Sequence, residues 1–228
     1  MSTRLDIIVE MVEENKVVCD VGTDHGITAM RVFDEKNPKM VIGTDISKNS
    51  LQKLRDKIQD TKYDIKTVVT DGIKDLEKYH PENIIISGMG GFLISEILER
   101  GMKVAKKADK LILQANNSLA HLRMFLEKEG FLITDERIAF DEDIYYDIIE
   151  AHFTGNQTND YKHDFEYEYG KLIIERKDPL FRDKLEKIIQ KSTKIKSQLI
   201  GINTESANKR IAEIDKEIED IEEILRCL

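Results

Sequence analysis

The sequence predicts an α/β protein: a Rossmann-like, doubly wound and mostly parallel sheet, followed by an antiparallel coiled-coil hairpin of two helices. Three observations lead to this prediction. Short apolar runs alternate with helical patterns through residues 1–156, which is typical of strand–helix units that build a parallel sheet. The last two apolar runs are joined only by a turn at 141–143, so they predict an antiparallel pair. Heptad spacing of apolar residues then fills residues 179–228.

The strands and helices of the sheet domain follow from the spacing of apolar residues. Apolar runs predict parallel strands at 17–21, 40–46, 65–71, 83–88 and 110–116, and a closing antiparallel pair at 131–140 and 144–153. Helical periodicity predicts helices at 4–15, 26–35, 47–59, 93–108 and 119–130. Ser47 is the expected N-cap of the third helix. A seven-stranded sheet that ends in an antiparallel pair resembles class I methyltransferases more than dinucleotide-binding dehydrogenases.

Composition limits the classes of function. Hydrophobic residues make up 40% of the 228, enough for a sizeable core, and the net charge is −9. The two cysteines, Cys19 and Cys227, lie far apart in sequence, which favours a reducing compartment over a disulfide framework. The N-terminal segment has no signal-peptide pattern, and no apolar run is long enough to span a membrane. We therefore expect a soluble cytoplasmic protein that is a monomer or weak dimer and has no membrane partner.

The turn after the first strand, DVGTDHG, is acidic and rich in glycine. Right-handed crossovers place such turns beside the ligand crevice, at the carboxyl ends of the strands. The turn lacks the GxGxxG pattern of a pyrophosphate site. Its acids suit S-adenosylmethionine, which carries an ammonium and a sulfonium but no phosphate. The alternative interpretation is an ordinary loop in which the histidine only stabilises the turn. The expected cofactor-binding residues are Asp20, Gly22, Thr23, Asp24, His25 and Gly26.

Two further acids follow the second and third strands. Asp45, with Ile46 after it, can accept hydrogen bonds from both ribose hydroxyls, or can instead help to start the next helix. Asp71 can accept from an adenine amino group, although Asp71-Gly72 is also a common turn. Acids at three successive strand ends together favour an adenosyl ligand.

The fourth strand ends in SGMGGFL, which has three glycines within residues 88–91. This places bare backbone where we expect methyl donor and acceptor to meet, so Gly88, Met89 and Gly90 are assigned to the cofactor side and Gly91 to the substrate side. After the fifth strand, Gln114 and Asn116 either read a base edge or cap the next helix. The five histidines have no metal-ligand spacing, so no metal site is expected.

The motifs GTDHG, IISGMGG, LILQAN and YYDIIEA, followed by the heptad hairpin, resemble the TrmK family of bacterial tRNA (adenine-22-N1)-methyltransferases over essentially the whole chain. The resemblance implies methyl transfer from S-adenosylmethionine to N1 of an adenine in tRNA, with Asp24, Gly88, Met89 and Asn116 at the catalytic centre. The sequence departs from the family pattern at Ile27, Ala29 and Ala115, where the family usually has Tyr, Pro and Pro. Asp45 also lies in TDIS, which is nearer to general methyltransferases than to the family's usual GEV-type segment. The alternatives are a methyltransferase with a small-molecule or protein substrate, and a non-catalytic coiled-coil adaptor.

The predicted domains are a catalytic domain at 1–156, a linker at 157–178 and the hairpin at 179–228. Residues 171–200 contain nine basic and four acidic residues, while residues 201–228 contain four basic and eight acidic ones. We expect a stripe of lysines on the first hairpin helix to bind the tRNA backbone, namely Lys184, Lys187, Lys191 and Lys194. The alternative is that Asp215, Glu217 and Glu222 of the second helix pair with this stripe.

Overall fold

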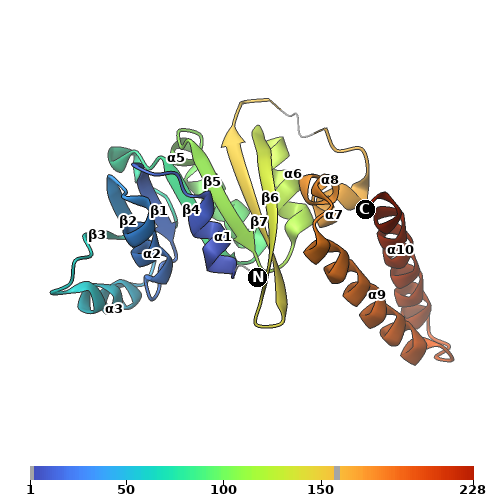
Figure 1. Ribbon diagram of the computed structural model, residues 1–228. Helices are drawn as coiled ribbons and strands as arrows, with labels where there is room; N and C mark the ends of the chain where they lie inside the picture. The colour runs from blue at the N-terminus through green and yellow to red at the C-terminus, as the bar shows by residue number, and fades with distance from the viewer. Residues whose placement is uncertain (1–2, 157–159) are drawn as a thin grey trace. The chain divides into compact units, whose positions relative to one another are not determined.

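The computed structural model describes residues 3–156 and 160–228, which form two compact units, Met1–Tyr161 and Lys162–Leu228. The first unit is an α/β domain and the second consists of helices (Figure 1). In the described ranges, no helix is both long and apolar enough to cross a membrane.

The first unit contains a seven-stranded sheet with the order β3-β2-β1-β4-β5-β7-β6. Its strands are β1 (Val17–Val21), β2 (Met40–Asp45), β3 (Ile65–Val69), β4 (Asn83–Met89), β5 (Lys110–Ala115), β6 (Phe131–Asp141) and β7 (Ile144–Phe153). Strands β1 to β5 are parallel, and β7 pairs antiparallel with both β5 and β6. The predicted fold class, a mostly parallel sheet closed by an antiparallel hairpin, is confirmed.

Helices cover both faces of this sheet. They are α1 (Arg4–Met11), α2 (Ile27–Lys36), α3 (Lys48–Ile58), α4 (Gly91–Arg100), α5 (Met102–Ala105) and α6 (Leu119–Lys128), with a short 3₁₀ turn, η1 (Glu77–Tyr79). Helix α1 packs against α2, and α4 packs against α6; right-handed crossovers place these two pairs on opposite faces. Ser47 caps α3 as predicted, because its hydroxyl accepts the N–H of Ser50 at 3.2 Å.

One predicted helix, at 93–108, is divided in the structure. Helix α4 ends at Arg100 and α5 begins at Met102, with Gly101 between them. A Cβ at Gly101 would lie 2.3 Å from Cγ1 of Ile73, so only glycine allows the chain to approach the turn after β3 so closely. The prediction of one continuous helix was wrong because helical periodicity does not reveal this tertiary contact.

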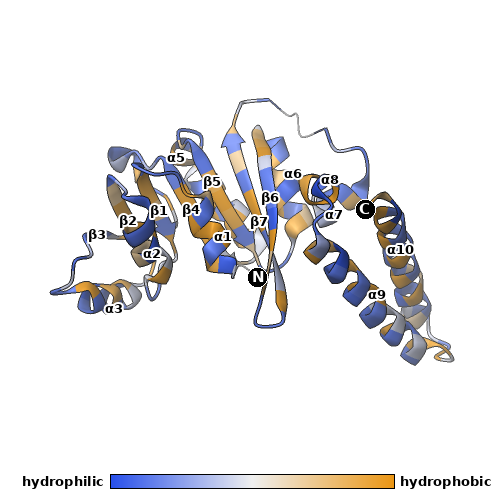
Figure 2. Ribbon diagram, in the orientation of Figure 1, coloured by the Kyte–Doolittle hydropathy of each residue, from blue (hydrophilic) through white to orange (hydrophobic). Residues whose placement is uncertain are grey.

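The hydrophobic core lies along the central strands, which Figure 2 shows as mainly apolar. Ile85 of β4 and Ile112 of β5 are fully buried, and α1 adds the fully buried Ile8 and Val9 to the same cluster. The strand order reverses between β1 and β4, and the turns after the parallel strands all lie at one edge of the sheet. This reversal is where ligands of doubly wound sheets bind.

The second unit contains four helices: α7 (Asp164–Tyr169), α8 (Lys171–Arg176), α9 (Pro179–Leu199) and α10 (Glu205–Cys227). The sequence predicted a linker at 157–178, but α7 and α8 form within it; residues 157–159 lie outside the described residues. Tyr169 and Ile173 are buried, and the Tyr169 ring lies 6.5 Å from that of Phe181 in α9. A polar, tyrosine-rich segment therefore joins the helical unit through its few apolar side chains.

Helices α9 and α10 form the predicted hairpin and pack against each other. Asp178 caps α9 with Pro179 in its first turn, and Thr204 caps α10 by accepting the N–H of Ala207 at 3.2 Å. The buried residues of α9 are Phe181, Leu185 and Ser192, and those of α10 include Ile214 and Ile221; both sets have the spacings of the predicted heptads. Ala207 and Ile224 are also buried on α10.

Candidate functional site

A cavity of about 360 Å³ lies at the carboxyl ends of β1 to β4. Its volume is in the range of small-molecule and cofactor sites. Six residues predicted from sequence as cofactor-binding line it together: Gly22, Asp45, Ile46, Asp71, Gly72 and Met89. These residues come from four different strand ends, so the sheet topology alone brings them to one place.

Each of the two acids in this cavity is held through one of its own carboxylate oxygens. Asp45 accepts the backbone N–H of Ser47 on Oδ1 at 2.7 Å, so the other oxygen can accept from a ligand. Asp71 pairs through Oδ2 with Nε of Arg100, at 2.9 Å. Both carboxylates are thus oriented before any ligand binds. Next to Asp45, the Ile46 side chain is 74% exposed, an apolar surface at the mouth of the cavity.

The glycines of the cavity cannot be replaced without a clash. Gly22 has φ of +72°, and a Cβ there would lie 2.3 Å from the Met89 methyl carbon. Gly72 has φ of +65°, and its Cβ would lie 2.5 Å from Cγ2 of Ile97. Both positions combine a left-handed backbone with close packing, so they expose backbone rather than side chain to the cavity.

Asp20 and Thr23 lie beneath the first turn rather than in the cavity lining. Asp20 is only 4% exposed and accepts the Thr23 hydroxyl at 2.7 Å. Burial raises the pKa of Asp20 to about 6, although hydrogen bonds from Thr23 and from the backbone of Ala29 oppose the shift. Gly26 caps α2 with φ of +66°, where a Cβ would lie 2.3 Å from Leu54. These residues hold the turn in shape.

Asp24 and His25 are exposed, in contrast to the buried Asp20 and Thr23. Their side chains are 56% and 62% exposed, and they contact each other at 3.2 Å between Oδ2 and Nε2. Neither lines the cavity, so the structure does not bring them together with Asp45 and Asp71.

Gln114 and Asn116 form a network with the end of β4. The Gly88 N–H donates to Oε1 of Gln114 at 2.9 Å, and Nδ2 of Asn116 donates to the Gly88 carbonyl at 2.8 Å. Gln114 is fully buried, and its Nε2 donates to Oδ1 of Asn116 at 3.0 Å. Both amides therefore hold the backbone of Gly88 and the adjoining Met89 in place, and this positioning was not predicted.

Gly90 and Gly91 allow α4 to begin against the loop after β5. The Gly91 N–H donates to the Asn117 carbonyl at 3.0 Å, and a Cβ on Gly91 would lie 2.3 Å from the Ser118 carbonyl oxygen. A Cβ on Gly90 would lie 2.9 Å from Oδ1 of Asn117. The three glycines of the GMGG turn thus have different environments, and Gly91 is buried in packing rather than open to a substrate.

Comparison with known proteins places this site in a family. A family model described as a methyltransferase domain matches residues 1–149. The chain belongs to this family. The methyltransferase is 25% identical to a Bacillus subtilis protein named tRNA (adenine(22)-N(1))-methyltransferase, over 99% of this chain and 97% of the relative.

Solved structures agree with this assignment. Streptococcus pneumoniae Sp1610, described as a putative tRNA (m1A22) methyltransferase, is 26% identical and has a TM-score of 0.84, with 99% of each chain covered. A structure of Sp1610 in complex with S-adenosyl-L-methionine is 25% identical in the aligned residues, with a TM-score of 0.79 over 99% of each chain. The resemblance inferred from the sequence motifs is confirmed.

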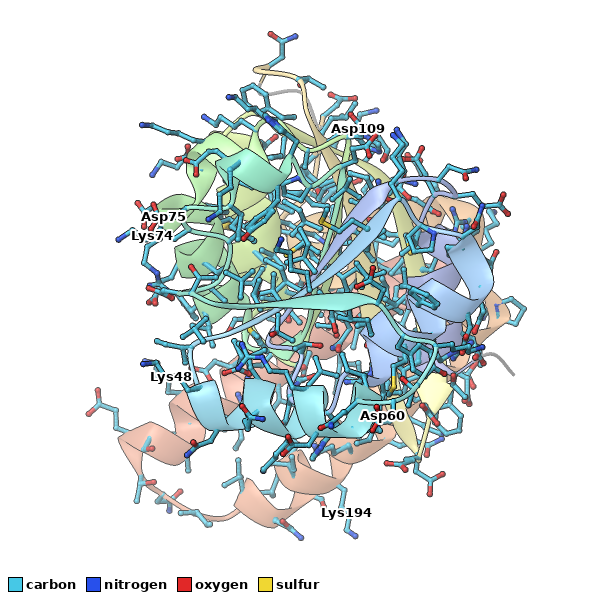
Figure 3. The ribbon with its side chains drawn as sticks, turned by 90° about the vertical axis from the view of Figure 1, so that its left-hand side faces the viewer. Lys48, Asp60, Lys74, Asp75, Asp109 and Lys194 are labelled. Atoms are coloured by element: carbon cyan, nitrogen blue, oxygen red, sulfur yellow. The ribbon has the colours of Figure 1, made fainter. Side chains whose placement is uncertain are left out.

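The lysine stripe of the methyltransferase lies on α9 of the second unit. Lys187 pairs with Asp183 at 3.3 Å, and Lys184 is half-buried. Lys191 and Lys194 are exposed and make no ion pair within the described ranges; Figure 3 shows Lys194 extending from its helix.

The acids of α10 make other contacts. Asp215 pairs with Lys196 rather than with the stripe, and Glu217 accepts the Ser192 hydroxyl at 2.7 Å. Neither acid therefore neutralises Lys191 or Lys194, although Lys196 of α9 does pair with an acid of α10.

Sequence reasoning missed three groups of the methyltransferase at this edge of the sheet. Arg100 orients Asp71, from which it is far removed in sequence. Arg4 donates to Gln114 from the first turn of α1, at 3.1 Å. Phe92 stacks on His121 with ring centroids 3.9 Å apart. Phe92 lies within the SGMGGFL motif, but no motif predicts these three contacts, because each joins separate elements. No group of three or more His, Cys, Asp or Glu side chains among the described residues could hold a metal ion.

Proposed function

We propose that this chain transfers the methyl group of S-adenosylmethionine to N1 of an adenine in tRNA, which is adenine 22 by likeness to its relatives. The observation that carries the proposal is the cavity at the strand reversal, where Asp45 and Asp71 stand beside bare glycine backbone. Within a methyltransferase family, this lining favours a cationic adenosyl ligand without phosphates. The tRNA substrate is inferred from the names of relatives that align over nearly the whole chain.

The residues present fit this cofactor. The outward oxygen of Asp45 accepts the ribose hydroxyls, and the apolar Ile46 packs against the adenine ring. Asp71, held by Arg100, accepts from the adenine amino group. Gly22 and Gly72 keep the left-handed turns of the cavity packed closely against Met89 and Ile97. The nearby carboxylates also stabilise the positive charge of the cofactor.

The methyl transfer requires no proton transfer by the protein at the nucleophile. Adenine N1 has a lone pair and no proton, so no general base is required at the nucleophile. The cofactor supplies an electrophilic methyl group when it is bound. The chain itself has to hold the base in line with that methyl and exclude water, and positioning alone can contribute about 7–11 kcal/mol. The Gly88–Met89 backbone, fixed by Gln114 and Asn116, provides a rigid wall for this purpose.

We assign the tRNA-binding role to the hairpin and the catalytic role to residues 1–156. Lys191 and Lys194 are exposed cations on α9 that can contact the phosphate backbone. The target adenine has to leave its stack to reach the cavity, at a cost of a few kcal/mol, which backbone contacts offset. We expect the enzyme to act in the cytoplasm, as a monomer or weak dimer and without a metal.

The direct test is transfer of a radiolabelled methyl group from S-adenosylmethionine to bulk tRNA. We expect label on unmodified tRNA, and loss of label when adenine 22 of a purified transcript is changed to guanine. Label retained on the changed transcript would refute the assignment of the target base. Absence of label on any tRNA, together with binding of the cofactor, would indicate another substrate.

The role of the hairpin has its own test. The double variant Lys191→Glu/Lys194→Glu should bind tRNA at least about tenfold more weakly and keep its affinity for S-adenosylhomocysteine, because each lost phosphate contact lowers affinity. The matched control is Lys103→Glu/Lys107→Glu, which makes the same charge change on exposed residues at and just after α5. Equal tRNA affinity of the two variants would remove the hairpin from the binding site.

A further inference from the structure

Arg4 is a cation at the carboxyl edge of the sheet, and it has no acidic partner within residues 3–156 and 160–228. Its guanidinium donates to Oε1 of Gln114 at 3.1 Å and lies over the Tyr146 ring, 5.0 Å from the ring centroid. Among the described residues, no carboxylate forms an ion pair with it. Other arginines nearby differ: Arg31 pairs with Asp6 and Glu35, and Arg100 pairs with Asp71 and Glu96.

The position of Arg4 is fixed by the same network that shapes the end of β4. Gln114 accepts from both the Gly88 N–H and Arg4, so one amide oxygen joins the three residues. A Cβ built on Gly88 would lie 3.7 Å from Nη1 of Arg4, and Gly88 itself is exposed. The guanidinium therefore borders the backbone that continues into Met89 in the cavity lining. Figure 1 shows the start of α1 at the same edge as the turn between β6 and β7.

The order of the strands predicts how an adenosyl ligand crosses this edge. With adenine near Asp71 after β3 and ribose on Asp45 after β2, the group on the ribose 5′ carbon continues across β1 toward β4. Neighbouring strands are about 4.8 Å apart, so the ends of β2 and β4 are about 10 Å apart. The sulfonium and the three carbons beyond it extend in this direction and end in an ammonium and a carboxylate.

The carboxylate is the one anionic group of this cofactor, and the cavity lining is mainly unsuited to it. Asp45 and Asp71 repel it, and Arg100, the cation among the lining residues, is already paired with two acids. The Arg4 guanidinium lies over the Tyr146 ring and gives one N–H to Gln114, so other N–H groups of its planar fork remain for a carboxylate.

We propose that Arg4 binds the carboxylate at the amino-acid end of the cofactor. The proposal rests on the proposed function, because it takes S-adenosylmethionine as the ligand of the cavity. It assigns to α1 a part in the cofactor site in addition to its part in the core, and it makes Gln114 the residue that positions Arg4.

The test compares two ligands that differ only in this end. S-adenosylhomocysteine carries the amino-acid group, whereas 5′-methylthioadenosine has the same adenosyl thioether without it. We expect Arg4→Gln to weaken S-adenosylhomocysteine binding by about tenfold or more in calorimetry, a loss of about 1.4 kcal/mol. Its affinity for 5′-methylthioadenosine should be that of the wild type. The affinity of Arg4→Lys for S-adenosylhomocysteine should lie between those of the wild type and Arg4→Gln, because lysine keeps the charge but lacks the planar fork of arginine.

Arg31→Gln is the matched control, since Arg31 supports the same helix through Asp6 at 2.7 Å but does not reach Gly88. It should leave both affinities unchanged. Equal weakening of both ligands by Arg4→Gln would show that Arg4 only supports the Gly88 backbone, and unchanged S-adenosylhomocysteine binding with a raised KM for tRNA would place Arg4 on the substrate. Either result overturns the proposal. Failure of the wild type to bind either ligand would instead overturn the proposed cofactor.

Discussion

Replacing Asp20 by asparagine should change how the free energy of unfolding depends on pH. Burial raises the pKa of Asp20 from 3.8 to about 6, so the folded protein holds this proton more tightly than the unfolded chain does. The resulting stability is fully present below about pH 3.8 and is lost as the pH rises through 6. Each pH unit between these values corresponds to about 1.4 kcal/mol, which amounts to about 3 kcal/mol in total.

Asparagine has nearly the same shape, can accept the Thr23 hydroxyl and does not titrate. The assay is urea denaturation of the wild type and Asp20→Asn at a series of pH values from 4 to 8. Subtracting one curve from the other removes the contributions of the acids that both proteins share. The difference should grow by about 2.4 kcal/mol in favour of the variant between pH 4 and 7, because part of the total is already lost at pH 4. A difference that does not vary with pH, or that grows in the opposite direction, would refute the reasoning from burial.

Two further predictions concern the cavity and the GMGG turn after β4. Asp45→Asn should weaken binding of S-adenosylhomocysteine by about tenfold in calorimetry, because a neutral amide is a poorer acceptor for the ribose hydroxyls; affinity equal to that of the wild type would exclude Asp45 from the site. Gly91→Ala should lower the free energy of unfolding by about 1–3 kcal/mol in urea, because its Cβ would lie 2.3 Å from the Ser118 carbonyl oxygen; unchanged stability would mean that this loop yields without cost.

The sequence predicted strands better than long-range contacts. The bounds of β1 agree with the prediction because apolar residues fill the run and a glycine turn ends it. Asp45 and Asp71 could be located because the carboxyl ends of parallel strands share one edge. That Asp20 lies under the turn while Asp45 lines the cavity could not be predicted, because both follow apolar runs in the same way. Only the packing of the turn distinguishes them.

Local sequence patterns could not predict the contacts that orient the side chains of the site. Arg100 and Asp71 belong to different strand–helix units, and Arg4 meets Gln114 across more than a hundred residues. The helices within 157–178 were missed for a related reason. Their sequence is polar, and the burial of Tyr169 beside Phe181 depends on a helix further along the chain.

The unequal distribution of charge between α9 and α10 makes the hairpin electrostatically asymmetric. Basic residues predominate on the first helix and acidic residues on the second, and Lys191 and Lys194 remain unneutralised by Asp215 and Glu217. A polyanion is therefore attracted to one side of the hairpin and repelled from the other. On the proposed tRNA-binding role of the hairpin, repulsion by α10 would restrict the orientations in which tRNA can bind to α9, although the protein as a whole carries a charge of −9.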